Sequence, residues 1–204
     1  TRINYLTANS YYKFSDNIFG RTTVGYLEPM YSGISTELLY APISKSHYFG
    51  AEINYIKPRE FKQMFGFREI DGMPSINGHL TSYWDTGYYY YKSQVDIGRY
   101  LAGDKGATIT LTRDFPNGWK VGGFFTLTDA SFSQFGEGSF DKGIFFRMPF
   151  NSLIPYETTG GVYEKIKPIQ GDGGARVFVG NRLYDIVSDH SIEKYKRSWP
   201  RLWR

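Results

Sequence analysis

The sequence predicts an all-β protein, specifically an antiparallel up-and-down transmembrane β-barrel of about 12 strands. Three observations lead to this fold class. The 204 residues are 19% aromatic, with 18 Tyr, 16 Phe and 23 Gly, a composition that favours strands and disfavours disorder. Segments of about ten residues alternate between apolar and polar side chains. Turn signals separate these segments at intervals too short for crossover helices.

The alternation is clearest in residues 119–127, where Val121 and Phe125 share one side of the expected strand and Lys120 and Thr126 share the other. A strand produces this period of two because successive side chains point to opposite faces. The same pattern occurs in residues 18–26, 34–40, 48–56, 76–84 and 107–112.

The number of strands follows from the spacing of the turn signals. About ten alternating segments fit before residue 150, and one or two more strands are expected within residues 160–168 and 175–187. The run Pro116-Asn117-Gly118 is typical of a hairpin turn, because Gly and Asn tolerate the positive φ angles that tight hairpins need.

The connections between these segments differ in length in a regular way. The even-numbered connections are tight and lie at residues 30–33, 58–60, 85–87 and 115–118. The odd-numbered set contains longer connections at residues 101–106 and 129–138. Outer-membrane barrels have short periplasmic turns and longer outer loops, so this asymmetry predicts that the first strand starts on the periplasmic side.

Two architectures share this pattern. A soluble sandwich or barrel turns its apolar face to a core, whereas a membrane barrel turns that face to lipid and encloses a polar lumen. Segments of about ten residues are long enough to cross a bilayer. Aromatic side chains such as Tyr11, Trp84, Tyr100 and Trp119 also gather near segment ends, as aromatic girdles do at membrane interfaces. The pattern favours the membrane barrel and leaves the sandwich open.

The composition excludes several kinds of site. The chain has no Cys and three scattered His, so we expect no disulfide framework and no metal site. The glycines near Lys142 lack the spacing of a phosphate-binding loop, and we expect no cofactor and no nucleic acid. The chain contains no apolar run of about 18 residues, so we expect no membrane-spanning helix. Residues 194–204 form a basic cluster, expected to be a solvated tail or a contact for anionic lipid, polysaccharide or a partner chain.

Several longer strings resemble one known family. Residues 98–104 read Gly-Arg-Tyr-Leu-Ala-Gly-Asp, and residues 135–143 read Phe-Gly-Glu-Gly-Ser-Phe-Asp-Lys-Gly. Further strings in the same order lie at residues 25–33, 36–42, 78–83, 106–108, 117–122, 172–174 and 183–184. Together they resemble the C-terminal part of the YjbH family, which includes GfcD-like proteins, from about residue 2 to residue 187.

The resemblance implies an outer-membrane β-barrel of a Gram-negative bacterium that acts in exopolysaccharide or group 4 capsule secretion. Residues 1–187 are then expected to be the barrel, as the C-terminal part of a longer protein, and residues 188–204 a basic tail. The implied role is passive, a polar aromatic-lined path or docking platform for the glycan, so we expect no enzyme activity. The implied partners are outer-membrane lipid or lipopolysaccharide, the polysaccharide, and either the N-terminal region of the parent protein or other export proteins.

The strand side that would face the lumen carries the candidate glycan contacts. Charged groups there can bond sugar hydroxyls, and aromatic rings can stack on sugar faces. The same residues would also fit an inert lumen filled by cross-strand ion pairs. The candidates are Arg21, Glu37, Tyr48, Glu52, Tyr83, Asp96, Lys120, Phe124 and Arg147.

The family strings add a second group of candidates. These are Arg99, Asp104, Glu137, Asp141 and Lys142. Residues 135–143 are expected to form an outer loop at the barrel mouth, where the last three make internal ion pairs. Two carboxylate pairs, Glu28 with Glu37 and Glu52 with Asp96, have the residue types of a glycosidase site, but no spacing rule marks them as catalytic.

Two other functions stay open at this point. A soluble β-sandwich carbohydrate-binding module would be monodisperse in plain buffer. A glycan-modifying enzyme, the weaker alternative, would leave shortened oligosaccharides.

Overall fold

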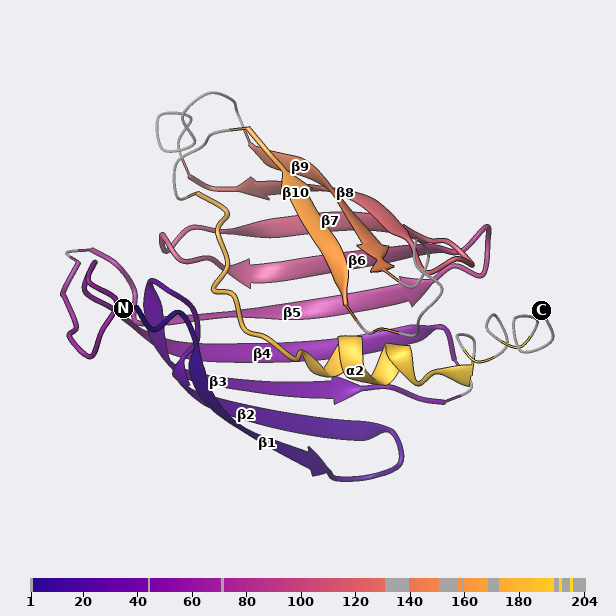
Figure 1. Ribbon diagram of the computed structural model, residues 1–204, viewed down its shortest axis with the longest axis horizontal. Helices are drawn as coiled ribbons and strands as arrows, with labels where there is room; N and C mark the ends of the chain where they lie inside the picture. The colour runs from indigo at the N-terminus through magenta and orange to yellow at the C-terminus, as the bar shows by residue number, and fades with distance from the viewer. Residues whose placement is uncertain are drawn as a thin grey trace.

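The computed structural model of the chain describes residues 2–43, 45–70, 72–130, 140–150, 158, 160–168, 173–192, 195 and 199. Its main element is one antiparallel sheet of ten strands (Figure 1). Each strand pairs with the strands next to it in sequence, which makes an up-and-down meander. The all-β, antiparallel, up-and-down prediction is therefore confirmed.

The first five strands are β1 (Leu6–Lys13), β2 (Ile18–Tyr26), β3 (Tyr31–Tyr40), β4 (His47–Pro58) and β5 (Ile76–Asp85). The second five are β6 (Tyr91–Arg99), β7 (Lys105–Asp114), β8 (Lys120–Thr128), β9 (Asp141–Pro149) and β10 (Gly161–Ile166). The turn between β7 and β8 has the predicted geometry. Gly118 has a φ angle of 90°, and its N–H donates to the Phe115 carbonyl at 2.9 Å.

The sheet corrects the sequence prediction in its strand count and in its closure. The described residues form ten strands rather than about 12, and the sheet is open, with β1 and β10 as its edges. Residues 59–75 form a connection where the spacing predicts one more strand. Phe65 and Phe67 alternate there as strand residues do, but the nearby backbone groups bond locally. The Glu60 N–H donates to the Gly66 carbonyl at 3.0 Å.

The missing strand also changes the parity of the connections. The long connections at residues 59–75 and 129–140 both lie at the end of the sheet where β1 starts. Residues 14–17, at the opposite end, form a short turn. Connection length therefore no longer supports placing the start of β1 on the periplasmic side.

The two faces of the sheet have opposite polarity. On the convex face, the exposed fraction is 59% for Ile53, 44% for Val121, 39% for Phe125 and 38% for Ile109. On the concave face, polar side chains are buried. They include Arg21, Thr23, Ser35, Glu37, Glu52, Asn54, Asn77, His79, Thr81, Asp96, Thr108 and Thr126. The predicted division of each strand into an apolar and a polar side is confirmed, and the apolar side points outward.

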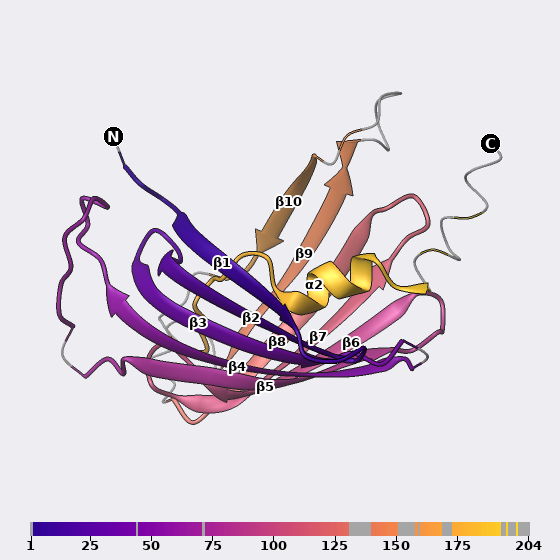
Figure 2. The ribbon, with the colours of Figure 1, turned by 90° about the horizontal axis from the view of Figure 1, so that it is seen from below.

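A segment that follows the last strand lies inside the curve of the sheet, as Figure 2 shows. We call residues 173–190 the crossing segment. It contains an irregular stretch and the helix α2 (Leu183–Asp189). The prediction of a strand within residues 175–187 is thus wrong. Val177 and Val179 alternate as strand residues do, but they pack on the sheet face rather than pair at its edge.

Two small apolar clusters attach the crossing segment to the concave face. One contains Leu27, Ile56, Leu101, Val177 and Val179. The other contains Leu39, Ala41, Tyr48, Tyr83 and Leu183. Within the described ranges, no helix is long and apolar enough to cross a membrane.

The end of the sheet where β1 starts is held together by Arg59, which is fully buried. Its guanidinium donates to the carbonyl groups of Glu28 at 3.1 Å and of Ile3 at 2.9 Å. It also lies over the Tyr26 ring, 4.0 Å from the centroid. These contacts connect the chain start, the β2–β3 turn and the connection after β4.

Candidate functional site

Ion pairs on the concave face connect the sheet to the crossing segment. Arg21 of β2 and Glu37 of β3 are cross-strand partners, with 3.0 Å between the Arg21 Nη2 and Glu37 Oε2 atoms. The Glu37 carboxylate also accepts the Leu183 N–H at 3.1 Å. Arg21 donates in addition to the Gly180 carbonyl at 2.6 Å. This pair therefore fixes the start of α2.

Two arginines of the crossing segment bind carboxylates on β4 and β6. Arg182 lies 3.2 Å from Glu52, and Arg176 lies 2.6 Å from Asp96 and 3.8 Å from Glu52. Asp96 also accepts the Thr81 hydroxyl at 2.7 Å. Since buried charges need partners, these predicted lumen residues hold the crossing segment in place. Arg176 and Arg182 were not among the residues predicted from the sequence to be functional.

The predicted aromatic residues Tyr48 and Tyr83 are covered by Tyr184 of α2. The Tyr83 and Tyr184 rings are stacked with centroids 3.7 Å apart. The Tyr48 ring meets Tyr184 edge-on at 5.7 Å. Burial raises the pKa of the Tyr184 hydroxyl, so that group stays neutral. These rings form a contact between helix and sheet, and they present little free face to a ligand.

The two carboxylate pairs considered for catalysis are also engaged with the crossing segment. Glu37 and Glu52 stand opposite each other on β3 and β4, and each contacts an arginine. Glu28 accepts the Phe178 N–H at 3.0 Å. In the described part of the chain, no group of three or more His, Cys, Asp and Glu is placed to hold a metal ion. This geometry fixes a chain segment, and of these four described carboxylates only Asp96 lines a cavity, one of about 410 Å³.

A polar cavity of about 690 Å³ lies between α2 and the inner faces of β6–β10. We call it, together with an adjoining cavity of about 410 Å³, the inner groove. The two parts have lining residues in common, namely Gln94, Thr110, Phe145, Tyr163 and Phe178. The wider part is lined by Lys120 and Arg147, and the narrower part by Phe124. These three candidates, together with Tyr83 and Asp96, line one groove, as the strand parity predicts.

The walls of the inner groove offer both charges and rings. Lys92 and Asp114 form an ion pair at 2.9 Å on the sheet side. The rings of Phe145 and Tyr163 lie 6.2 Å apart. Lys165 lies over the Phe124 ring, 4.0 Å from the centroid. Phe145, Tyr163 and Lys165 were not among the predicted site residues. The period of two could have indicated the inward direction of Phe145, which lies two residues before Arg147 on β9, whereas Tyr163 and Lys165 lie on β10.

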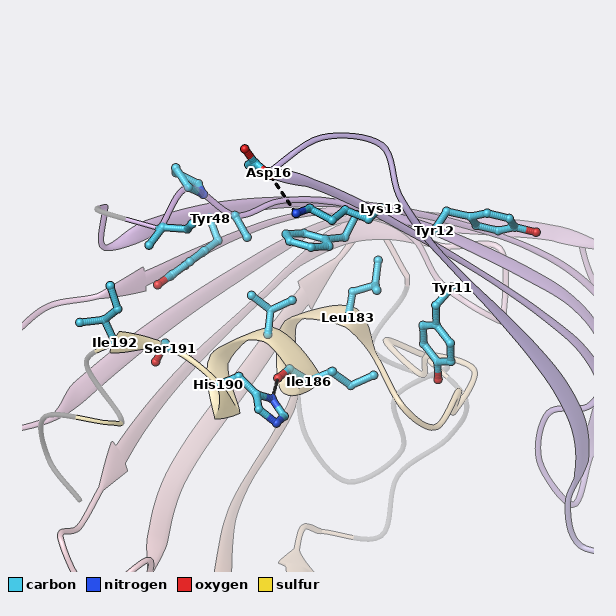
Figure 3. Close-up of a pocket in the computed structure, with 15 residues that line it drawn as sticks. Tyr11, Tyr12, Lys13, Asp16, Tyr48, Leu183, Ile186, His190, Ser191 and Ile192 are labelled. Carbon is cyan, nitrogen blue, oxygen red and sulfur yellow. Dashed lines mark hydrogen bonds and ion pairs between the residues drawn. The ribbon is translucent and has the colours of Figure 1, made fainter. Parts of the chain in front are cut away.

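A different cavity, of about 810 Å³, lies on the other side of α2. Its apolar lining includes Phe19, Leu183 and Ile186, and Tyr11 and Tyr12 of β1 border it (Figure 3). Few polar groups point into this cavity, so it is a poor site for a sugar chain. The crossing segment thus divides the concave side into an apolar part near β1–β3 and the polar inner groove near β6–β10.

The second group of candidates lies at the sheet end where β7 and β9 begin. The Asp104 carboxylate accepts the Gly174 N–H at 2.9 Å, and Arg99 donates to the Gly103 carbonyl at 3.2 Å. Asp141 and Lys142 belong to β9 rather than to a loop, so they point to opposite faces. The Lys142 ammonium lies over the Phe140 ring. Glu137 lies outside the described residues, so the predicted ion pairs stay unsupported.

Comparison with known proteins identifies the family. A family model described as "Exopolysaccharide biosynthesis protein YbjH" matches residues 1–189. The chain belongs to the YjbH family. One YjbH-family relative, the "Uncharacterized lipoprotein YjbH" of Escherichia coli (strain K12), is 32% identical over 191 residues. The match covers 93% of this chain and 27% of that relative, so the chain spans about a quarter of its length. No solved structure matches this YjbH-family chain.

Proposed function

We propose that this chain is an outer-membrane β-barrel segment of a Gram-negative exopolysaccharide secretion system, with the inner groove as a polar path or docking platform for the glycan. The observation that carries the proposal is the polarity of the sheet. Its convex face is apolar and exposed, and its concave face is polar and buried. A barrel in lipid needs this arrangement, and a soluble sandwich needs the reverse.

The extent of the apolar face supports the membrane reading. Exposed apolar patches larger than a few hundred Å² are rare on soluble monomers. Here large apolar side chains are exposed on nearly every strand. They include Ile18, Val24, Ile34, Leu38, Phe49, Ile53, Ile76, Leu80, Ile97, Ile109, Leu111, Val121, Phe125, Leu127 and Ile144. In the proposal, lipid or lipopolysaccharide covers this face.

The open edges of the sheet have a role in the proposal. In lipid, unpaired backbone groups cost several kcal/mol each, so a β-sheet is stable there only as a closed barrel. β1 and β10 run in opposite directions, because the sheet has an even number of antiparallel strands. Further strands, from the rest of the parent protein or from another export protein, can therefore close the ring with antiparallel pairing throughout.

The inner groove fits a passive role. Its lysine, arginine, threonine and tyrosine side chains can hydrogen-bond hydroxyls, and its rings can stack on sugars. The carboxylates considered for catalysis are bound to arginines or to backbone N–H groups. We therefore propose that the glycan is guided or docked, with no bond made or broken and no cofactor.

Two measurements test the proposal. The protein is expected to require detergent for solubility and to migrate faster on a gel before heating than after it. Deleting the part of the parent gene that encodes these 204 residues is expected to abolish polymer at the cell surface, while intact polymer accumulates inside the cell. A folded chain that is monodisperse without detergent would instead identify a soluble carbohydrate-binding module. Shortened oligosaccharides in the presence of the protein would identify an enzyme.

A further inference from the structure

Two positive charges stand directly opposite each other on the sheet wall of the inner groove. Lys120 of β8 and Arg147 of β9 are cross-strand partners, and both line the polar cavity of about 690 Å³. Among the residues that the structure describes, neither has a carboxylate oxygen within 4.0 Å. Like charges in this position destabilise a sheet. The fold gives this pair no close carboxylate partner, only the longer-range attraction of the Asp185 carboxylate on α2.

The rest of the wall extends the positive charge along the strands. On β10, Tyr163 stands opposite Arg147 and Lys165 stands opposite Phe145. Lys165 is therefore two residues further along the same face, about 7 Å at the rise of a strand. Three of the described carboxylates also lie in the wider part of the groove. Asp114 is paired with Lys92, and Asp185 and Asp189 belong to α2 on the facing wall. The Asp185 carboxylate is attracted by Arg182, Lys120 and Arg147 without forming a close ion pair with Lys120 or Arg147.

We propose that the Lys120–Arg147 pair binds the carboxylate of an acidic polysaccharide, with Phe145 and Tyr163 contacting its sugar ring. This inference rests on the proposed function and names the substrate class of that same groove. A carboxylate between the two cations removes their repulsion and gains charge-assisted hydrogen bonds. The pair lies on the concave side, away from the apolar face, so a glycan reaches it more directly than a lipid headgroup does.

Binding of oligogalacturonate to the purified full-length protein tests this inference. Calorimetry compares oligogalacturonate with its methyl ester, which has the same sugar chain without the charge. We expect the acid to bind at least about tenfold more tightly, because one charge-assisted hydrogen bond contributes a factor of about ten. The double variant Lys120→Gln/Arg147→Gln is expected to bind both forms equally weakly.

Three controls make the result specific. Lys142→Gln removes the same charge from the other face of β9 and is expected to bind as the wild type does. The exchange Lys120→Arg/Arg147→Lys keeps both charges and is expected to retain the preference for the acid. Heat-modifiable migration shows that each variant is folded.

Several outcomes would overturn the inference. One is equal affinity of the wild type for the acid and its ester, and another is an unchanged preference in the double variant. If the double variant lost binding to anionic lipid nanodiscs and still bound oligogalacturonate as the wild type does, the pair would be assigned to a lipid headgroup instead. The proposed function fails separately, because polymer export and detergent dependence are measured without these variants.

Discussion

At the scale of single residues, the concave face shows how a protein keeps charges out of water. Glu37, Glu52 and Asp96 are buried, and each is held by an arginine. Leaving one such charge without its partner is costly. Glu28 differs from these three, because it is partly buried and its carboxylate is bonded to a backbone N–H rather than to a cation.

Glu28 predicts a pH dependence of stability. Burial raises the pKa of its carboxyl above the ordinary 4.5, against the lowering effect of the Phe178 N–H. The folded state therefore holds the proton more strongly than the unfolded state. Its contribution to stability is fully present below pH 4.5 and is lost as the pH rises through the raised value. Glu28→Gln keeps an oxygen for the Phe178 N–H and cannot titrate.

We expect the free energy of unfolding to fall less between pH 4.5 and pH 7 in Glu28→Gln than in the wild type. Urea unfolding in detergent micelles at both pH values measures this difference. Glu69→Gln, which changes an exposed carboxylate, serves as the control. Identical pH slopes for Glu28→Gln and the wild type would contradict the assignment.

The residue directions were predictable from the sequence, and the contacts were not. Alternation along one strand is a local property, so the inward parity of Arg21, Glu37 and Lys120 follows from the sequence alone. The partners of Glu37 and Glu52 lie 146 and 130 residues further along the chain, at Leu183 and Arg182. No local pattern encodes a contact over such a separation.

At the scale of elements, the crossing segment is the part that the sequence misled us about. Val177 and Val179 alternate as strand residues do, and a seven-residue helix follows them. Tertiary contacts decide where this segment lies. They are two apolar clusters and the ion pairs of Arg176 and Arg182. These ion pairs predict how the segment can be released.

The double variant Arg176→Gln/Arg182→Gln is expected to detach the crossing segment while the sheet stays folded. Breaking a buried ion pair costs about 3 kcal/mol or more, and the double variant leaves Glu52 and Asp96 without their arginine partners at the same time. Chymotrypsin is expected to cut after Tyr184 in the variant but not in the wild type, where this ring is packed on Tyr83. Arg99→Gln, at an exposed arginine, is expected to behave as the wild type. Equal protection of all three proteins would show that the apolar contacts suffice.

At the scale of the whole molecule, the sheet is a curved wall with one apolar surface and one polar surface. The composition and the alternation predicted both surfaces. The number of strands was overestimated because Phe65 and Phe67, in the connection after β4, imitate a strand. Closure was also beyond the sequence, since the pairing of two distant edges depends on curvature that no local pattern records.

A charge on the convex face tests whether lipid covers it. Ile53 lies near the middle of β4 and is 59% exposed. Ile53→Lys is expected to destabilise the protein by about 2–4 kcal/mol in a bilayer, the cost of a lysine near the midplane. Tyr88→Lys, in the connection between β5 and β6, is expected to change stability by less than about 0.5 kcal/mol. Urea unfolding in liposomes measures both, and equal effects would contradict embedding of the sheet.

The position of the crossing segment has a consequence for how the molecule comes together. It follows all ten strands in the chain and yet lies within their curve. In the proposed barrel it can enter before the last two edges meet or through an open end of the cylinder, and in both cases its contacts are with the concave face. The segment can bind only after the strands that supply this face have assembled, so its docking depends on prior folding of the sheet.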